Sequence, residues 1–190
     1  MPGKVSIIGA GNVGTATAFA LAINGSANEI VLLDRNLKKA EGEVLDIEHG
    51  SAFLPYTSFK GTKSYKDIKD SDVVVITAGA NQKPGQTRLQ LLSQNVAILK
   101  GIVAEIKKVA PHCILMIVTN PVDVLTFYAK KFSGFPNHRV FGTGTVLDTA
   151  RYRDYIAKCF GVNAHNVHAY ILGEHGDSSF AALSTANIGS

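Results

Sequence analysis

Short, wholly apolar runs alternate along this chain with longer segments in which apolar residues recur at helical spacing. The apolar runs predict strands that are buried on both faces, at residues 4–8, 29–34, 72–79 and 113–120. The longer segments predict helices at residues 12–25, 36–49 and 86–109. In the third helix one apolar stripe is formed by Leu91, Leu92, Val96, Leu99, Val103 and Ile106. Alternation of this kind predicts an α/β fold, a doubly wound parallel sheet with helices on both faces.

The alternation of strands and helices continues beyond Pro121, but the last predicted elements do not complete a domain. A helix is expected from Pro121 to about Lys131, and the later elements are a strand at 138–144, a helix at 145–160 and an extended piece around 166–172. The last residues begin a new apolar segment without completing it. We therefore expect an α/β domain at residues 1–142 and, at residues 143–190, the beginning of an incomplete α+β domain.

Composition narrows the class of protein. The 190 residues are 46% hydrophobic and 18% charged, with a formal net charge of +4, which is typical of a globular protein. The lysine pairs are scattered on helix-like segments, so we expect no nucleic-acid partner. The two cysteines form no CxxC pair, and a buried Cys113 fits a cytoplasmic location. No apolar run approaches about 18 residues and no signal-peptide pattern precedes the first strand, so we expect no membrane partner, and we expect no metal site.

A glycine pattern follows the first predicted strand and opens the first helix. Gly9, Gly11 and Gly14 form G-x-G-x-x-G, which allows a tight turn, close approach of a pyrophosphate and close packing of the helix on the strand. Asp34 ends the second strand, 20 residues after Gly14, where a carboxylate can accept hydrogen bonds from both ribose hydroxyls. The plain alternative is a glycine turn beside an unrelated acid. The context favours a Rossmann domain that binds NAD rather than NADP.

Further segments carry a resemblance to a known family. "AGANQKPGQTR" (78–88), "TNPVDVLT" (119–126), "GTGTVLDTAR" (142–151) and "GEHG" (173–176), together with the glycine loop, stand in the order and spacing of the L-lactate/L-malate dehydrogenase family. The chain is most similar to the bacterial L-lactate dehydrogenase branch. The resemblance implies NAD-dependent hydride transfer at C2 of a 2-hydroxy acid. The cofactor residues it implies, besides Gly9, Gly11, Gly14 and Asp34, are Asn12, Val13, Thr77, Ala78, Gly79 and Asn120.

The catalytic residues follow from the same resemblance and can be weighed on chemistry. His175 would donate or remove the proton of the substrate oxygen, a task that suits imidazole near neutral pH. Asp148 would hold the imidazole ring in one tautomer. Arg151, three residues along the same helix, would bind the substrate carboxylate through two parallel hydrogen bonds. The plain alternatives are a histidine in a polar turn and a surface ion pair between Asp148 and Arg151.

A glycine- and proline-containing loop supplies the remaining substrate contacts. Arg88 ends the loop and, by resemblance, polarises the substrate carbonyl when the loop closes, although it could also be a solvent-facing arginine at a helix start. Asn120, at a strand end before Pro121, resembles the asparagine that contacts the nicotinamide ribose and the substrate oxygen. Gln82 stands where the malate branch has arginine. A neutral side chain leaves a second substrate carboxylate unpaired, which favours pyruvate and lactate over oxaloacetate and malate.

Two cationic candidates can face away from this pocket. Arg153 lies two residues past Arg151, on roughly the opposite side of the helix. His168 lies seven residues before His175 and has the opposite strand parity if that run stays extended. Both resemble the residues that bind fructose 1,6-bisphosphate at a subunit interface in allosteric bacterial lactate dehydrogenases. The alternative is a solvent arginine and an interface histidine.

Three functions stay open from the sequence. The first is an L-lactate dehydrogenase represented by its N-terminal part, because the family chain continues well past residue 190. The second is a malate or broader 2-hydroxyacid dehydrogenase. The third is a non-catalytic NAD-binding or subunit-association module. The expected partners are a small-molecule substrate, a bisphosphate activator and further copies of the chain in a dimer or tetramer.

Overall fold

Six parallel strands form the central sheet of the computed structural model, which describes residues 3–81 and 84–189. The strand order is β3-β2-β1-β4-β5-β6, so the order reverses between β1 and β4. Such a switch point leaves a crevice at the carboxyl ends of the two strands. The strands are β1 (Lys4–Ile8), β2 (Glu29–Leu33), β3 (Ser58–Thr62), β4 (Val73–Ile76), β5 (Ile114–Ile117) and β6 (Val140–Gly142).

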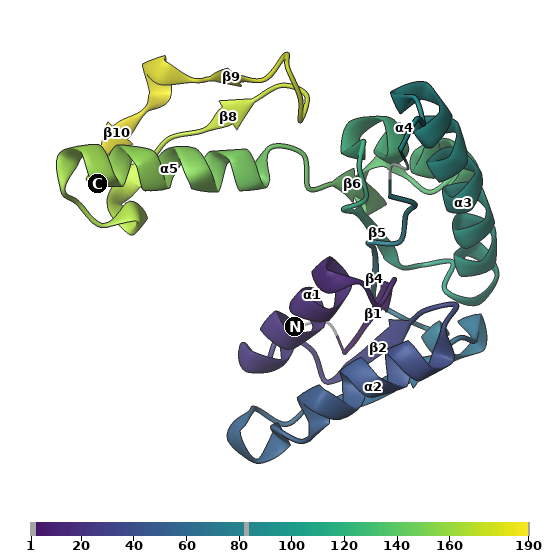
Figure 1. The fold of residues 1–190 in the computed structure, drawn as a ribbon. Helices are drawn as coiled ribbons and strands as arrows, with labels where there is room; N and C mark the ends of the chain where they lie inside the picture. Colours follow the sequence, from purple (N-terminus) through teal and green to yellow (C-terminus); the bar gives the residue numbers. More distant parts are fainter. Residues whose placement is uncertain (1–2, 82–83, 190) are drawn as a thin grey trace.

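Two layers of helices cover the sheet, as expected from the sequence (Figure 1). Apolar residues of α1 and α2 pack with one face of β1 and β2, where Ile7, Ile30 and Leu32 are fully buried. Apolar residues of α3 and α4 pack on the other face in a second core. The helices are α1 (Asn12–Ile23), α2 (Leu37–Glu48), α3 (Arg88–Val109) and α4 (Val122–Ser133), and short 3₁₀ turns are η1 (Ser51–Phe53), η2 (Tyr65–Ile68) and η3 (Asn137–Arg139).

The apolar stripe predicted on α3 is confirmed. Leu99, Val103 and Ile106 are buried in the core, and Leu92 and Val96 pack against it. Leu89–Val109 is long and apolar enough to cross a membrane by length and composition, although no such run was expected from the sequence. In this fold one side of the helix packs on the α/β core, and a helix that covers such a core can pass the same test.

One strand of the sheet was not predicted from the sequence. β3 pairs in parallel with β2 at the edge of the sheet, from Ser58 opposite Glu29 to Thr62 opposite Leu33. From Ser58 to Gly61 its residues alternate between exposed and partly buried positions, and only Thr62 is buried. An edge strand with one solvated side needs no apolar run, so the feature that marks the central strands is absent here.

Residues after β6 form an arm that extends away from the sheet (Figure 1). Helix α5 (Val146–Phe160) lies along its length and packs with Val167 and Ala169 in a small core of its own. Two antiparallel pairs of very short strands join β7 to β10 and β8 to β9. The remaining elements are η4 (Ala164–Asn166), β7 (Val167–His168), β8 (Ile171–Leu172), β9 (Phe180–Ala181), η5 (Leu183–Thr185) and β10 (Asn187–Ile188).

Two of the expected boundaries in this region are wrong. The strand expected at 138–144 is extended only at Val140–Gly142, because η3 occupies the residues before it. The extended piece expected at 166–172 is divided into β7 and β8, which pair with different partners. Apolar alternation indicates an extended backbone, but the partner strand decides where each strand ends.

Candidate active site

The glycine loop lies at the switch point, directly after β1. Gly9 has a φ of +111°, a conformation that a residue with a side chain rarely adopts. A Cβ atom on Gly14 would lie only 1.9 Å from the carbonyl oxygen of Gly9, so this helix turn packs against the loop without space for a methyl group. A Cβ on Gly11 would meet nothing within 4 Å, which leaves open space beside the backbone at the start of α1.

This open space adjoins helix N–H groups that need an acceptor. Gly11 is the N-cap of α1 and offers no side chain to the first turn. The first N–H groups of a helix have no partner within the helix, and they attract anions together with the helix dipole. Asn12 and Val13 are exposed at this turn. The residues present therefore fit the pyrophosphate of a dinucleotide.

Asp34 is held beside the loop by the backbone on both sides of it. Its Oδ2 accepts a hydrogen bond from the Ala10 N–H at 2.9 Å, and its Oδ1 accepts one from the Asn36 N–H at 2.9 Å. A carboxylate has about four acceptor sites, so two such bonds leave capacity for ribose hydroxyls. The side chain is thus fixed at the end of β2 and still able to bind a ligand.

The turn after β4 contacts the glycine loop on one side and the end of β5 on the other. The Thr77 hydroxyl lies 3.1 Å from the Ile8 carbonyl oxygen and 3.0 Å from that of Gly9, and it donates to this pair. Ala78 is partly buried, and a Cβ on Gly79 would lie 2.4 Å from Cγ2 of Thr119. The tight fit brings the ends of β1, β4 and β5 together, as expected for residues that share one crevice.

Asn95 organises this crevice and was not predicted from the sequence. The side chain is 3% exposed on α3, where its Oδ1 accepts a hydrogen bond from the Ala80 N–H at 2.8 Å. Its Nδ2 donates to the carbonyl oxygen of Asn120 at 3.2 Å, directly before the cis peptide bond to Pro121. A polar residue within the apolar stripe of a helix was the available signal, because a buried amide requires partners.

Two predicted catalytic residues and one predicted substrate-binding residue meet at the start of the arm. Nδ1 of His175 lies 2.6 Å from Oδ2 of Asp148, across 27 residues of sequence. The side chains are 28% and 24% exposed, so the pair is largely shielded from solvent. Nη1 of Arg151 lies 3.6 Å from the other carboxylate oxygen, Oδ1. Arg151 is itself 61% exposed, which leaves its guanidinium accessible to a ligand.

The contact with Asp148 fixes the orientation of the His175 ring. In the described part of the chain Nδ1 is its hydrogen-bonded nitrogen, and Nε2 has no protein partner. The backbone N–H of His175 also donates a hydrogen bond, to Oδ2 of Asp123 at 2.8 Å. A histidine held in this way can exchange a proton through its second ring nitrogen with a group placed beside it.

The loop between β4 and α3 carries the remaining predicted substrate residues. Arg88 is the first residue of α3, after a capping box that Thr87 and Gln90 form. The interpretation of Arg88 as a helix-start residue therefore agrees with its backbone position, and its role toward substrate stays a prediction. Gln82, on which the choice of substrate depends, lies outside the described residues.

The two candidate activator residues lie on the arm. Nη2 of Arg153 donates to the carbonyl oxygen of Ala164 at 3.2 Å, and the side chain is half-buried. His168 is exposed and lies opposite Asn187 in the β7–β10 pair. The parity argument that directed His168 away from His175 does not hold, because β7 and β8 are separate strands and a bent loop follows them. Their role stays a prediction.

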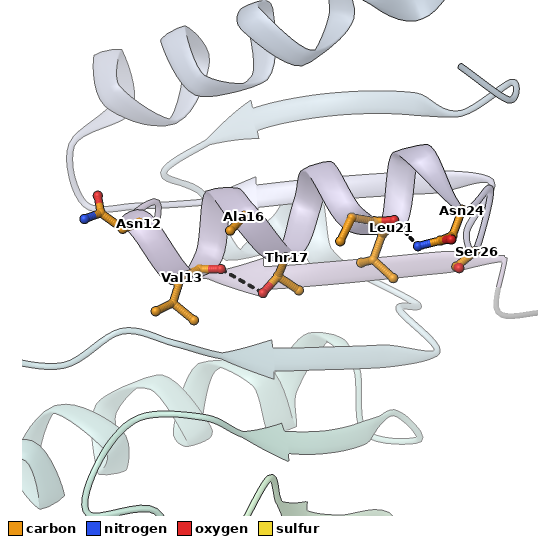
Figure 2. Close-up of a pocket in the computed structure, with 8 residues that line it drawn as sticks. Asn12, Val13, Ala16, Thr17, Leu21, Asn24 and Ser26 are labelled. Atoms are coloured by element: carbon orange, nitrogen blue, oxygen red, sulfur yellow. Dashed lines mark hydrogen bonds between the residues drawn. The ribbon is translucent and has the colours of Figure 1, made fainter. Parts of the chain in front are cut away.

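A hollow lies along the outer face of α1, beginning at the glycine loop. Figure 2 shows Asn12 and Val13 at one end and Asn24 at the other. The hollow has a volume of about 560 Å³. None of the proposed catalytic residues lines it. Among residues 3–81 and 84–189, no group of three or more His, Cys, Asp or Glu side chains is arranged to hold a metal ion.

A sheet with this strand order and a glycine loop at its switch point defines the class of dinucleotide-binding α/β proteins. Within this class, residues 3–142 match the family profile described as lactate/malate dehydrogenase, NAD binding domain. Residues 145–190 match the profile of the lactate/malate dehydrogenase alpha/beta C-terminal domain. The chain belongs to the lactate/malate dehydrogenase family, and its cofactor is NAD.

Individual relatives agree with this assignment. The L-lactate dehydrogenase of Acetivibrio thermocellus is 53% identical over 186 residues, which are 97% of this chain and 58% of that protein. L-lactate dehydrogenase 1 of Clostridium acetobutylicum is 52% identical over 97% of this chain. The solved minor L-lactate dehydrogenase of Enterococcus mundtii, in a ligand-bound form, superposes with a TM-score of 0.95 at 46% identity, covering 98% of this chain and 60% of that one. The chain thus spans somewhat more than half the length of its relatives.

Proposed function

We propose that the chain is part of an NAD-dependent L-lactate dehydrogenase that interconverts L-lactate and pyruvate. The observation that carries this proposal is the 2.6 Å contact between His175 and Asp148, with Arg151 at 3.6 Å from the same carboxylate. The names of the similar proteins support the choice of lactate within the family. A malate or broader 2-hydroxyacid dehydrogenase is the second candidate, and a non-catalytic NAD-binding module is the third.

The chemistry assigns a separate task to each side chain. In the direction of lactate, C2 of pyruvate receives a hydride while its carbonyl oxygen receives a proton from Nε2 of His175. Asp148 holds the ring through Nδ1, so that Nε2 carries the proton that is transferred. Arg151 binds the substrate carboxylate, for which a planar guanidinium is suited. Arg88 and Asn120 contact the substrate oxygen and stabilise the charge that develops on it.

When bound, NAD accepts the hydride of lactate, and in its reduced form it supplies the hydride to pyruvate. The backbone at Gly9, Gly11, Asn12, Val13 and Gly14 would hold its pyrophosphate. Asp34 would accept hydrogen bonds from the adenosine ribose, and the carboxylate would repel the 2′-phosphate of NADP. The turn at Thr77, Ala78 and Gly79 would line the path toward the nicotinamide, and Asn120 would contact the nicotinamide ribose.

The substrate is proposed from one neutral side chain. Gln82 offers no charge to a second carboxylate, so oxaloacetate would bury an unpaired anion whereas the methyl group of pyruvate would not. Replacing Gln82 with arginine should move the preference toward oxaloacetate by about two orders of magnitude in kcat/KM. Equal efficiency of the unaltered protein on pyruvate and oxaloacetate would support the second candidate instead.

We also propose that the NAD-binding domain ends at Gly142, with residues 143–190 forming the first part of the substrate domain. The end of β6 at Gly142 and the separate small core of the arm support this division. In the intact enzyme we expect a cytoplasmic homodimer or homotetramer. Size-exclusion chromatography coupled to light scattering would give a monomer mass if this expectation is wrong.

The activator site is a separate proposal. Arg153 and His168, with the same residues of a neighbouring subunit, would bind the two phosphates of fructose 1,6-bisphosphate. The half-burial of Arg153 and its hydrogen bond to the carbonyl oxygen of Ala164 support a structured position for its guanidinium. A pyruvate saturation curve that the bisphosphate leaves unchanged at neutral pH would contradict it.

The central experiment compares binding with turnover. NADH binding is measured by fluorescence titration, and NADH oxidation is followed at 340 nm with pyruvate or oxaloacetate. His175→Gln should reduce turnover by about 10³-fold or more while NADH affinity stays within about twofold. NADH binding without turnover, in the protein at the full length that its gene encodes, would establish the third candidate.

A further inference from the structure

One carboxylate of the NAD-binding half of the chain holds the backbone of the proposed catalytic histidine. Asp123 lies in the first turn of α4, and its Oδ2 accepts the hydrogen bond of the His175 N–H at 2.8 Å. The two residues are 52 positions apart in sequence and belong to different parts of the fold. Asp148 contacts the imidazole ring, so proton transfer by the ring does not explain the separate contact of Asp123 with the backbone N–H.

We propose that Asp123 is a positioning residue, which fixes the place of His175 relative to the cofactor crevice through its backbone N–H. Asp148 orients the imidazole and Asp123 locates its main chain, so two carboxylates from α5 and α4 hold one residue at both ends. The inference rests on the proposed function, in which His175 transfers the proton.

Asp123 lies close in sequence to the proposed contact with the nicotinamide. Asn120, the proposed nicotinamide contact, lies three residues before Asp123, at the junction of β5 and α4. The carbonyl oxygen of Asn120 is itself held by the buried Asn95. A short, well-anchored stretch therefore connects the proposed nicotinamide contact to the residue that holds the histidine. Misplacement of a catalytic group by about 1 Å can reduce turnover by about 100-fold.

The arm has little else to fix it against the sheet. Among the described residues, the bond from His175 to Asp123 is the one hydrogen bond that joins residues 146–189 to residues 3–142. Bonds within the loop, such as that from Ser178 to Glu174 at 2.9 Å, shape the loop but do not locate it. The hydroxyls of Thr145, at the N-cap of α5, and Thr149, on α5, both donate to the carbonyl oxygen of Ile171, so these bonds also lie within the arm. Loss of the Asp123 contact would let His175 move with the arm.

If Asp123 only stabilised helix α4, its substitutions would have a different pattern of effects. A carboxylate in the first turn of a helix interacts favourably with the helix dipole, and either alanine or asparagine would remove that interaction. Asparagine, however, retains an oxygen at nearly the same position and can still accept the bond from the His175 N–H. The positioning role therefore predicts rescue by Asp123→Asn, whereas a charge effect on α4 predicts that the two variants behave alike.

Hydrogen exchange tests the contact without requiring turnover. In this chain, NMR exchange of the His175 amide should accelerate by about tenfold in Asp123→Ala and by less than about threefold in Asp123→Asn. Asp46→Ala removes an exposed carboxylate of α2 that has no hydrogen-bond partner among the described residues, and it should leave this exchange unchanged. Circular dichroism and thermal unfolding show whether each variant is folded. Equal exchange in all four proteins would overturn the inference.

Kinetics of the protein at the full length that its gene encodes test the consequence. Asp123→Ala should lower kcat for pyruvate by about 100-fold, with NADH affinity within about twofold and a larger isotope effect with deuterated NADH. Asp123→Asn should recover kcat to within about tenfold of the unaltered protein. Equal losses in both variants would overturn the positioning role. Absence of pyruvate reduction in the unaltered protein would instead refute the proposed function, and the exchange experiment would still decide the contact.

Discussion

Replacing Gly14 with alanine places a methyl group where the fold has no space. The new Cβ would lie 1.9 Å from the Gly9 carbonyl oxygen and 2.9 Å from the Thr77 hydroxyl. To reach 3.0 Å from 1.9 Å, helix and loop must move apart by about 1.1 Å. Forced repacking of this kind costs about 2 kcal/mol. For a chain of 190 residues, we expect the melting temperature to fall by about 4–8 °C.

Gly11→Ala provides a matched comparison within the same loop. Its Cβ would meet no atom within 4 Å, and the φ of −82° suits alanine, so stability should be unchanged. The methyl group instead occupies the space proposed for the pyrophosphate. We expect NADH affinity to fall by at least about tenfold, which corresponds to about 1.4 kcal/mol.

Calorimetry and NADH titration on the two variants separate the two effects. Gly14→Ala should show lower stability with weaker binding, and Gly11→Ala should show weaker binding alone. An unchanged melting temperature in Gly14→Ala would refute the packing argument. Unchanged NADH affinity in a folded Gly11→Ala protein would refute the assignment of the cofactor to this loop.

Three further predictions follow from the described contacts. Burial raises the pKa of Cys113 to about 11, so a thiol reagent at pH 8 should modify the exposed Cys159 quickly and Cys113 only after unfolding. The hydrogen bond from Lys60 lowers the pKa of Asp67, so the roughly 1 kcal/mol by which Asp67→Asn destabilises the protein at pH 7 should shrink below about pH 4 in urea titrations. Gly42→Ala, on an exposed helical position with free space, should raise unfolding free energy by about 0.5–1 kcal/mol. The first prediction is wrong if Cys113 reacts in the folded protein, and the second is wrong if the stability difference between Asp67→Asn and the unaltered protein does not change with pH. The third is wrong if Gly42→Ala lowers the free energy of unfolding.

The fold could be predicted to the extent that local patterns are strong. The central strands are buried on both faces and therefore appear as apolar runs, and α3 shows its inner face through the spacing of Leu99, Val103 and Ile106. β3 could not be identified in this way, because an edge strand next to β2 requires only a partner for its backbone. The division of residues 166–172 into β7 and β8 likewise depends on which strands lie beside them.

The sequence by itself determined the glycine loop, the acid at the end of β2 and the family, since each depends on residue type at fixed spacing. It also identified His175, Asp148 and Arg151 as candidates, through their resemblance to family motifs. Only the tertiary structure brought Nδ1 of His175 to 2.6 Å from Asp148 and gave Asn95 and Asp123 their partners. These contacts join residues 15 to 52 positions apart, and no local pattern specifies which distant group a polar side chain will meet.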